Sequence, residues 1–175
     1  MMTANIAAEI WGAPIYPDGA LRELFFEKEA AEAFIGMDLS ALRALFPCIA
    51  EDATLPHPWW TKTPDSNPIL VERLRKFWAP ILSSGHSEVL AVGHGASVFG
   101  SMHFLNTTFG LGMPTDLSLL ADYLATRNVN CNLSCVETDD SGKMLSARMF
   151  ATTHIPDELI TSNTNARPRP AEICF

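Results

Sequence analysis

The stretch EVLAVGHGASVFGSMHFLN, residues 88–106, decides which fold the sequence predicts. Two apolar runs flank the tripeptide GHG, a pattern that favours two β-strands joined by a turn. Further strands follow, because NVNCNLSCVET at 128–138 alternates in polarity and KMLSARMFATTH at 143–154 returns after the turn sequence DDSG. The second half of the chain therefore predicts an antiparallel sheet.

The first half of the chain predicts helices. Apolar residues recur at helical spacing over residues 21–35, 39–46 and 69–82, with charged residues between them. Pro68 suits a first helical position, and 52–58 predicts a short strand. Residues placed to cap the three helices are Asp18, Asp38 and Asn67.

Residues 107–127 fit two structures. Thr115 or Asp116 could cap a short helix, or the segment could form a long hairpin tip and a strand. Both alternatives stay open at the level of sequence.

These elements predict a single α+β domain over 1–175, with the helices segregated from the sheet. A curved, mostly antiparallel sheet wrapped against three N-terminal helices forms a cone, and the mouth of the cone is the natural pocket for a small molecule. Residues 1–20 are expected to form an N-terminal arm and 161–175 an extended C-terminal tail.

Composition limits the partners. With 20 acidic against 12 basic residues the net charge is −8, which argues against a nucleic-acid partner. No apolar run reaches the length of about 18 residues that a membrane span needs, and the N-terminus lacks the basic region of a signal peptide. The four cysteines fit reduced thiols in a cytoplasmic protein.

Neither a metal nor a cofactor is expected. No three of the five histidines have the spacing of metal ligands. The segment GHGASVFG contains G-x-G, but with no helix expected after it the context of a dinucleotide site is missing.

The segments MDLSALRALF (37–46), EDATLPHP (51–58) and ETDDSGKMLSARMF (137–150) resemble motifs of the nuclear transport factor 2-like superfamily. That group includes ketosteroid isomerases, SnoaL-like polyketide cyclases and limonene-type epoxide hydrolases. The resemblance covers residues 21–155 and depends mostly on the order and spacing of the motifs. It implies a cone-shaped α+β barrel that encloses a hydrophobic pocket.

His57 is the first candidate residue that the resemblance implies. In ketosteroid isomerases the residue just before the matching proline is an aspartate that shuttles a proton, and His57 stands at that place here. An unperturbed imidazole has a pKa of about 6.5, so it can exchange protons near neutral pH. The alternative is a polar residue at a turn that hydrogen-bonds to the backbone.

Ser134 takes the place of the acidic oxyanion donor of the isomerases, eight residues before Gly142. The isomerases' tyrosine donor is absent, because the first helix offers only residues such as Phe25 there. The resemblance therefore implies a reaction other than the usual steroid isomerisation.

The strand around Ser134 has two faces, since side chains alternate along a strand. Asn130, Asn132 and Ser134 share one face, which is either the solvent face or a hydrogen-bonding wall for a developing negative charge. The other face is expected to pack on the core or on a partner. It carries Cys131, Leu133 and Cys135.

Two further residues are candidates for chemistry. Alternation along 88–106 puts His103 on one face with Phe99 and Ser101, where it would meet a ligand if that face lines the cone. Asp122 is a candidate base, because SnoaL-like cyclases and the epoxide hydrolases use carboxylates on their later strands.

The first functional hypothesis is a cofactor-independent acid–base enzyme: an isomerase, cyclase or dehydratase in secondary metabolism. It would act on a hydrophobic, oxygenated small molecule, with His57 moving the proton and Ser134, Asn132 and His103 stabilising the oxyanion. Trp59 and Trp60 would roof the pocket mouth or cover an oligomer interface, and for at least one of them simple packing is the favoured alternative. The substrate-binding walls would be formed by Phe25, Phe34, Trp59, Phe99, Asn130 and Met149.

The second hypothesis is a non-catalytic module that binds a small ligand or dimerises, with a homodimer formed through the open face of the sheet. A third, a hot-dog-type thioester hydrolase, ranks lowest, because that fold needs one long central helix cradled by a sheet. The first two differ in geometry: an enzyme needs His57 and a donor facing the same cavity.

Overall fold

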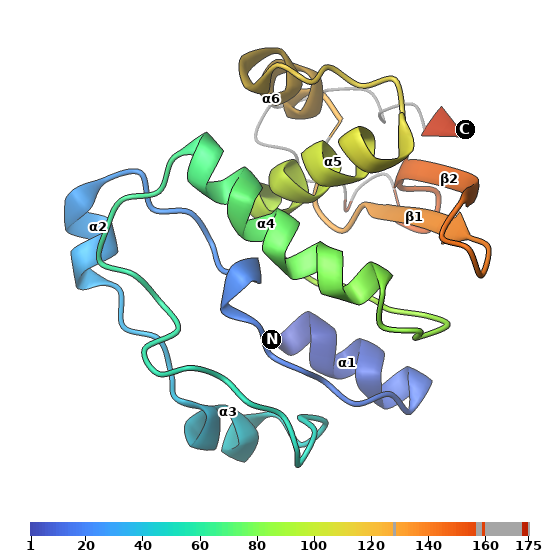
Figure 1. Ribbon diagram of the computed structural model, residues 1–175. Helices are drawn as coiled ribbons and strands as arrows, with labels where there is room; N and C mark the ends of the chain where they lie inside the picture. The colour runs from blue at the N-terminus through green and yellow to red at the C-terminus, as the bar shows by residue number, and fades with distance from the viewer. Residues whose placement is uncertain (128, 157–158, 160–172, 175) are drawn as a thin grey trace.

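Two helices at the centre of the structure, α4 (Asn67–Leu82) and α5 (Gly95–Phe109), pack against each other (Figure 1). The computed structural model describes residues 1–127, 129–156, 159 and 173–174. The helices approach closely because Gly100 has no side chain; a Cβ there would lie 2.9 Å from Leu74 Cγ. Trp78 Nε1 donates to Ser101 Oγ at 2.8 Å and ties the pair together further.

The prediction of two strands over 88–106 is wrong, because residues from Gly95 onward form α5. The buried positions Ser97, Ser101 and Leu105 recur every four residues, which is a helical period. The helix ends at Gly110, whose φ of 68° suits glycine and whose N–H donates to the carbonyl of Asn106. Small buried residues made the helical face hard to recognise.

The predicted cone-shaped α+β barrel is therefore also wrong. The described part of the chain is mostly helical, and within it no sheet curves around the helices. The sheet is the antiparallel hairpin of β1 (Leu133–Thr138) and β2 (Met144–Ala151), with the short β3 (Ile173–Cys174) beside β2. Three strands, one of two residues, are too few to wrap a pocket.

Several local predictions are confirmed. The third predicted helix is α4, although its N-cap is Ser66 and not the predicted Asn67. The hairpin closes through the turn at Asp139–Gly142, where Gly142 N donates to the carbonyl of Asp139. Asp38 caps α3 (Leu39–Leu45) by accepting from Ala41 N at 2.8 Å. In the ambiguous segment the helical alternative is the one that forms, as α6 (Leu117–Ala125).

The long helix predicted over 21–35 is wrong. The chain forms a 3-10 turn at Gly19–Leu21, capped by Asp18, and then the short helix α2 (Lys28–Ala33). Between them the backbone N–H and carbonyl of Phe25 hydrogen-bond to Asp65, far along the chain. A tertiary contact has thus taken the groups that a helix would use.

Three other predicted segments remain: the N-terminal arm, the strand over 52–58 and the C-terminal tail. The arm predicted over 1–20 contains α1 (Met2–Trp11). The strand predicted over 52–58 does not form; a short parallel bridge joins Ile15 and Ile49 instead. The extended tail predicted over 161–175 lies outside the described residues, apart from β3.

The main core lies between α5, α6 and the hairpin (Figure 1). A smaller core lies beside α3, where Leu42, Ile49 and Ala53 are buried against Ile15. Across the described ranges, none of the helices combines the length and hydropathy that a membrane span requires. The buried side chains of the main core are Met102, Leu105, Leu111, Met113, Leu120, Leu124, Ala147, Met149 and Phe150.

Candidate functional site

Four aromatic side chains, Phe25, Phe34, Trp59 and Trp60, form a cluster that we call the aromatic cluster. The ring centroid of Phe34 lies 4.9 Å from that of Phe25, 5.7 Å from that of Trp59 and 6.5 Å from that of Trp60. The two indoles meet edge-on at 5.6 Å. These are contact distances for aromatic rings, so each ring fills space beside its neighbour.

The indoles are positioned by local features of the chain. Trp59 Nε1 donates to the carbonyl of Met37 at 2.7 Å. Two glycines permit the approach, since a Cβ on Gly19 would lie 2.8 Å from the carbonyl oxygen of Trp59 and a Cβ on Gly36 would overlap both indole rings. Any larger residue at Gly36 would displace the rings.

A buried ionic group lies at the base of the aromatic cluster. Asp65 accepts two hydrogen bonds from the guanidinium of Arg22, at 2.6 and 2.8 Å, and one from Arg73 at 3.2 Å. The side chains of Asp65, Arg22 and Arg73 are 1%, 6% and 15% exposed. Each ion is buried with its partners, which is the condition under which a buried charge is tolerated.

The charges around Asp65 set its ionisation. Burial alone raises the pKa of the carboxyl, but the hydrogen bond from Arg22, the backbone N–H of Phe25 and the positive charges of Arg22 and Arg73 together hold the pKa below its ordinary value. Burial and the like charge of Arg22 lower the pKa of Arg73, against the opposing charges of Asp65 and Glu23. Asp65 is thus a carboxylate at neutral pH.

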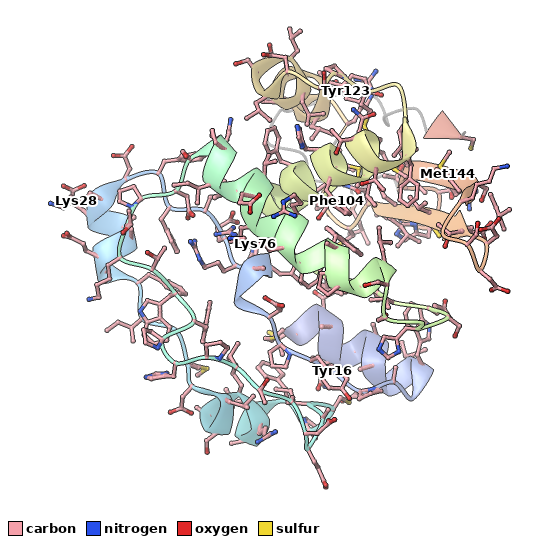
Figure 2. The ribbon with its side chains drawn as sticks, in the orientation of Figure 1. Tyr16, Lys28, Lys76, Phe104, Tyr123 and Met144 are labelled. Carbon is pink, nitrogen blue, oxygen red and sulfur yellow. The ribbon has the colours of Figure 1, made fainter. Side chains whose placement is uncertain are left out.

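Asp65 closes a long loop. Its backbone N–H donates to the carbonyl of Phe25 at 2.8 Å, and its carboxylate accepts from Phe25 N at 3.2 Å, across a sequence separation of 40 residues. Residues 26–64 lead away from Phe25 through α2 and α3 and return to Asp65, just before α4 (Figure 1). We call this segment the clasped loop; Figure 2 shows Lys28, on α2, at its left edge.

Four of the predicted site residues lie together. Phe25, Phe34 and Trp59 belong to the aromatic cluster, and the ring of His57 meets that of Trp60 edge-on at 5.2 Å. His57 itself is exposed, and its peptide bond to Pro58 is cis. The structure therefore places His57 on the surface beside the aromatic rings.

Two of the predicted oxyanion donors, Ser134 and Asn132, belong to the segment of the hairpin, on the opposite side of the α4–α5 pair (Figure 1). Ser134 Oγ accepts from Phe150 N at 3.1 Å, where the hairpin register is irregular. Asn132 Nδ2 donates to the carbonyl of Val129 at 2.7 Å, and Asn130 Nδ2 to that of Leu159 at 3.1 Å. These polar side chains satisfy the backbone where the ladder is interrupted.

The two faces of β1 are the reverse of the expectation that its apolar face packs on the core. Ser134 and Val136 are half-buried, and Val136 packs against the main core. Cys131, Leu133 and Cys135 are exposed, Leu133 by 48%. The homodimer through the sheet stays a prediction.

The remaining candidates lie on α5, α6 and β2. Since α5 is a helix, Phe99, Ser101 and His103 do not share one face as they would on a strand. Phe99 packs against the main core and His103 is half-buried, while Asp122 is exposed on α6. Met149 is fully buried in the main core.

A shallow open hollow of about 500 Å³ on α4, marked in Figure 2 by Lys76, contains none of the predicted residues. α5 does follow the sequence GHG, but residues 88–92 form no strand before it, so the strand–turn–helix of a dinucleotide site is missing. Within the described ranges, no three His, Cys, Asp or Glu side chains converge as metal ligands would.

The sequence alone does not identify Asp65 as a candidate residue. It lies in a proline-flanked loop, and its principal partner Arg22 is 43 residues away in sequence. Only its place just before a helix that carries Arg73 eight residues later gives any signal. The sequence offers Trp60 for the pocket mouth, an oligomer interface or simple packing, and only the fold shows that it packs against Phe34.

In comparisons with known proteins, no family model, no curated protein and no solved structure matches the chain. The resemblance to the nuclear transport factor 2-like superfamily therefore stays a prediction, and the function has to be argued from the geometry alone.

Proposed function

We propose that this protein is a non-catalytic binding module that docks a protein partner on the aromatic surface of the clasped loop. The observation that carries the proposal is the aromatic cluster at the loop's base together with exposed apolar side chains next to it. Phe26, Ile35 and Met37 are 59%, 76% and 48% exposed, and each adjoins the cluster along the chain or by a hydrogen bond. Aromatic residues and methionine are enriched at protein interfaces.

The packing of the rings favours a protein over a small molecule. A small ligand is normally enclosed over most of its surface by a concave site. The rings of Phe34, Trp59 and Trp60 touch one another, so no ligand fits between them. A partner surface can instead lie across the rings, with the tryptophans of the aromatic cluster as the anchoring residues.

The buried ions favour a preorganised surface. Arg22, Asp65 and Arg73 hold both ends of the clasped loop against α4 before any partner arrives. A surface that is ordered in advance loses less conformational entropy on binding. This supports a binding role for a loop that would otherwise be costly to fix.

Acid–base catalysis has less support. It needs His57 and a donor within reach of one ligand, whereas His57 is exposed and Ser134 and Asn132 bind the backbone of the distant hairpin. The proton-transfer reaction and its hydrophobic substrate stay predictions.

Binding should depend on the clasped loop and not on an equally exposed apolar residue elsewhere. A displayed library of random peptides is selected on the full chain, and the affinities of the enriched peptides are measured by calorimetry. Ile35→Ser is expected to weaken binding about tenfold or more, as loss of an interface anchor does. Ile10→Ser is the matched control, because Ile10 and Ile35 are both 76% exposed.

A second pair of variants repeats the comparison with tryptophan. Trp60→Ala removes an aromatic anchor of the cluster, and Trp11→Ala, the control, removes a tryptophan that is 57% exposed on α1. The proposal is overturned if no peptide is enriched, or if the enriched peptides bind Ile35→Ser and Trp60→Ala as tightly as the wild type. Circular dichroism checks that each variant is folded.

A further inference from the structure

The rim of the aromatic surface is acidic. Glu27, Glu29 and Glu32 lie at the start of α2 and along it, and Asp38 directly follows Met37; all four are exposed. α2 connects Phe25 to Phe34, so these exposed carboxylates lie next to the same apolar residues along the chain. Exposed charges next to an apolar centre are the usual arrangement of an interface rim.

The basic side chains of the clasped loop neutralise this rim only in part, since the segment has six acidic and three basic residues. Lys28 is paired with Glu32 at 3.7 Å, and Lys62 Nζ donates to the carbonyl of Glu32 at 3.3 Å. The guanidinium of Arg43 donates to the carbonyls that follow α3, at Ala50 and Glu51 among them. Negative charge therefore remains in excess around the aromatic cluster.

We infer that the partner presents a basic, amphipathic segment whose apolar side lies on the aromatic cluster and whose lysines or arginines face the acidic rim. The inference rests on the proposed function. Opposite charges at a rim speed association and exclude wrong partners, and the apolar centre supplies the contact area.

Charge also argues against a second copy of this chain as the occupant. Two clasped loops placed face to face would bring Glu27, Glu29 and Glu32 against their own equivalents, in a chain whose net charge is already −8. Like charges opposite one another at an interface are costly. A basic partner removes that cost.

The test uses a short helical peptide of leucine and lysine with its leucines on one face. Its binding to the full chain is followed by tryptophan fluorescence and calorimetry at low and high salt. We expect the wild type to bind the peptide and the affinity to fall about tenfold or more as salt screens the rim. A peptide with glutamate in place of lysine is expected not to bind.

Variants locate the effect. The triple variant Glu27→Gln, Glu29→Gln and Glu32→Gln is expected to bind the lysine peptide about tenfold more weakly and with less salt dependence. The matched control removes the same number of charges from exposed residues outside the clasped loop, and it is expected to bind within about twofold of the wild type. The control substitutions are Glu9→Gln, Glu88→Gln and Asp140→Asn.

The outcomes separate the inference from the proposed function. Equal weakening in both triple variants, or equal binding of the lysine and glutamate peptides, overturns the basic partner. If the peptides selected from the library still lose affinity in Ile35→Ser under that outcome, the proposed function stands. If those selected peptides bind Ile35→Ser as tightly as the wild type, the proposed function fails as well.

Discussion

Replacing Asp65 with asparagine is expected to lower the free energy of unfolding by about 3–5 kcal/mol, because it leaves two buried guanidiniums without their counter-ion. The side chain of Asp65 is 1% exposed and lies between Arg22 and Arg73. Asparagine keeps the shape and can still accept from Phe25 N, so the loss reports the charge. Urea unfolding at neutral pH, followed by circular dichroism, measures it.

An exposed carboxylate is the matched control. Glu72 pairs with Arg75 at 2.7 Å and with Lys76 at 3.5 Å, and both pairs are exposed. Glu72→Gln is expected to leave stability nearly unchanged, because solvent screens exposed ion pairs. If Asp65→Asn lowers the free energy of unfolding no more than Glu72→Gln does, the stabilising role of the Asp65 ion pairs with Arg22 and Arg73 is refuted.

The pH dependence of stability should carry the same signature. The folded pKa of Asp65 lies below its ordinary value of 3.8. The stabilisation that ionised Asp65 gives the folded state is therefore fully present above the pKa of Asp65 in the unfolded chain. It is lost as pH falls through the pKa of Asp65 in the folded protein. Between pH 7 and 5 stability should not depend on Asp65 ionisation, and below about pH 4 the wild type should lose stability more steeply than Asp65→Asn.

Replacing Phe150 with alanine is expected to lower the free energy of unfolding by about 3–5 kcal/mol, the usual cost of removing a buried aromatic ring. Phe150 is completely buried in the main core, where β2 meets α5 and α6. Its φ of 60° is unfavourable for a side chain and is held by the surrounding contacts. The ring's contacts and the cavity left behind both contribute to the loss.

Leu145 on the same strand gives the comparison. It is 66% exposed, so Leu145→Ala is expected to change stability by about 0.5 kcal/mol or less. Thermal and urea unfolding of the two variants, measured side by side, test the placement of the main core. Similar losses in both would mean that β2 faces the core differently from the structure described above.

Elements defined by local chemistry could be predicted from the sequence. Asp38 caps α3, Pro68 stands in the first turn of α4, and the hairpin turns at Asp139–Gly142. Each depends on side chains within a few residues of the backbone groups that they satisfy. Such signals survive whatever the rest of the fold is.

Elements defined by tertiary contact could not. α5 packs Gly100 and Ser101 against α4 and buries Ser97 beside Leu21, so its packing face is small and its apolar residues lie on several sides. Glycine and β-branched or aromatic residues in such a stretch suggest strands and turns. The predicted cone is wrong for the same reason, because its curved sheet would need the two strands predicted over 88–106.

The candidate site divides in the same way. The sequence predicts Phe25, Phe34 and Trp59 as walls of a pocket; in the structure Phe25 and Trp59 pack against Phe34, and His57 lies beside Trp60. Ser134 is predicted to face the same pocket across a curved sheet, but it lies in the short hairpin of β1 and β2. The ion pair of Asp65 with Arg22 spans 43 residues, and no local pattern encodes such a contact.

In the proposed function, a partner docks on the clasped loop. Amide hydrogen exchange of the full chain, with and without a saturating library-selected peptide, tests this. We predict that protection on binding is confined to Phe25–Met37 and His57–Trp60, while α5 and the hairpin are unchanged. Protection of β1 and β2, with no change in the clasped loop, would contradict the claim.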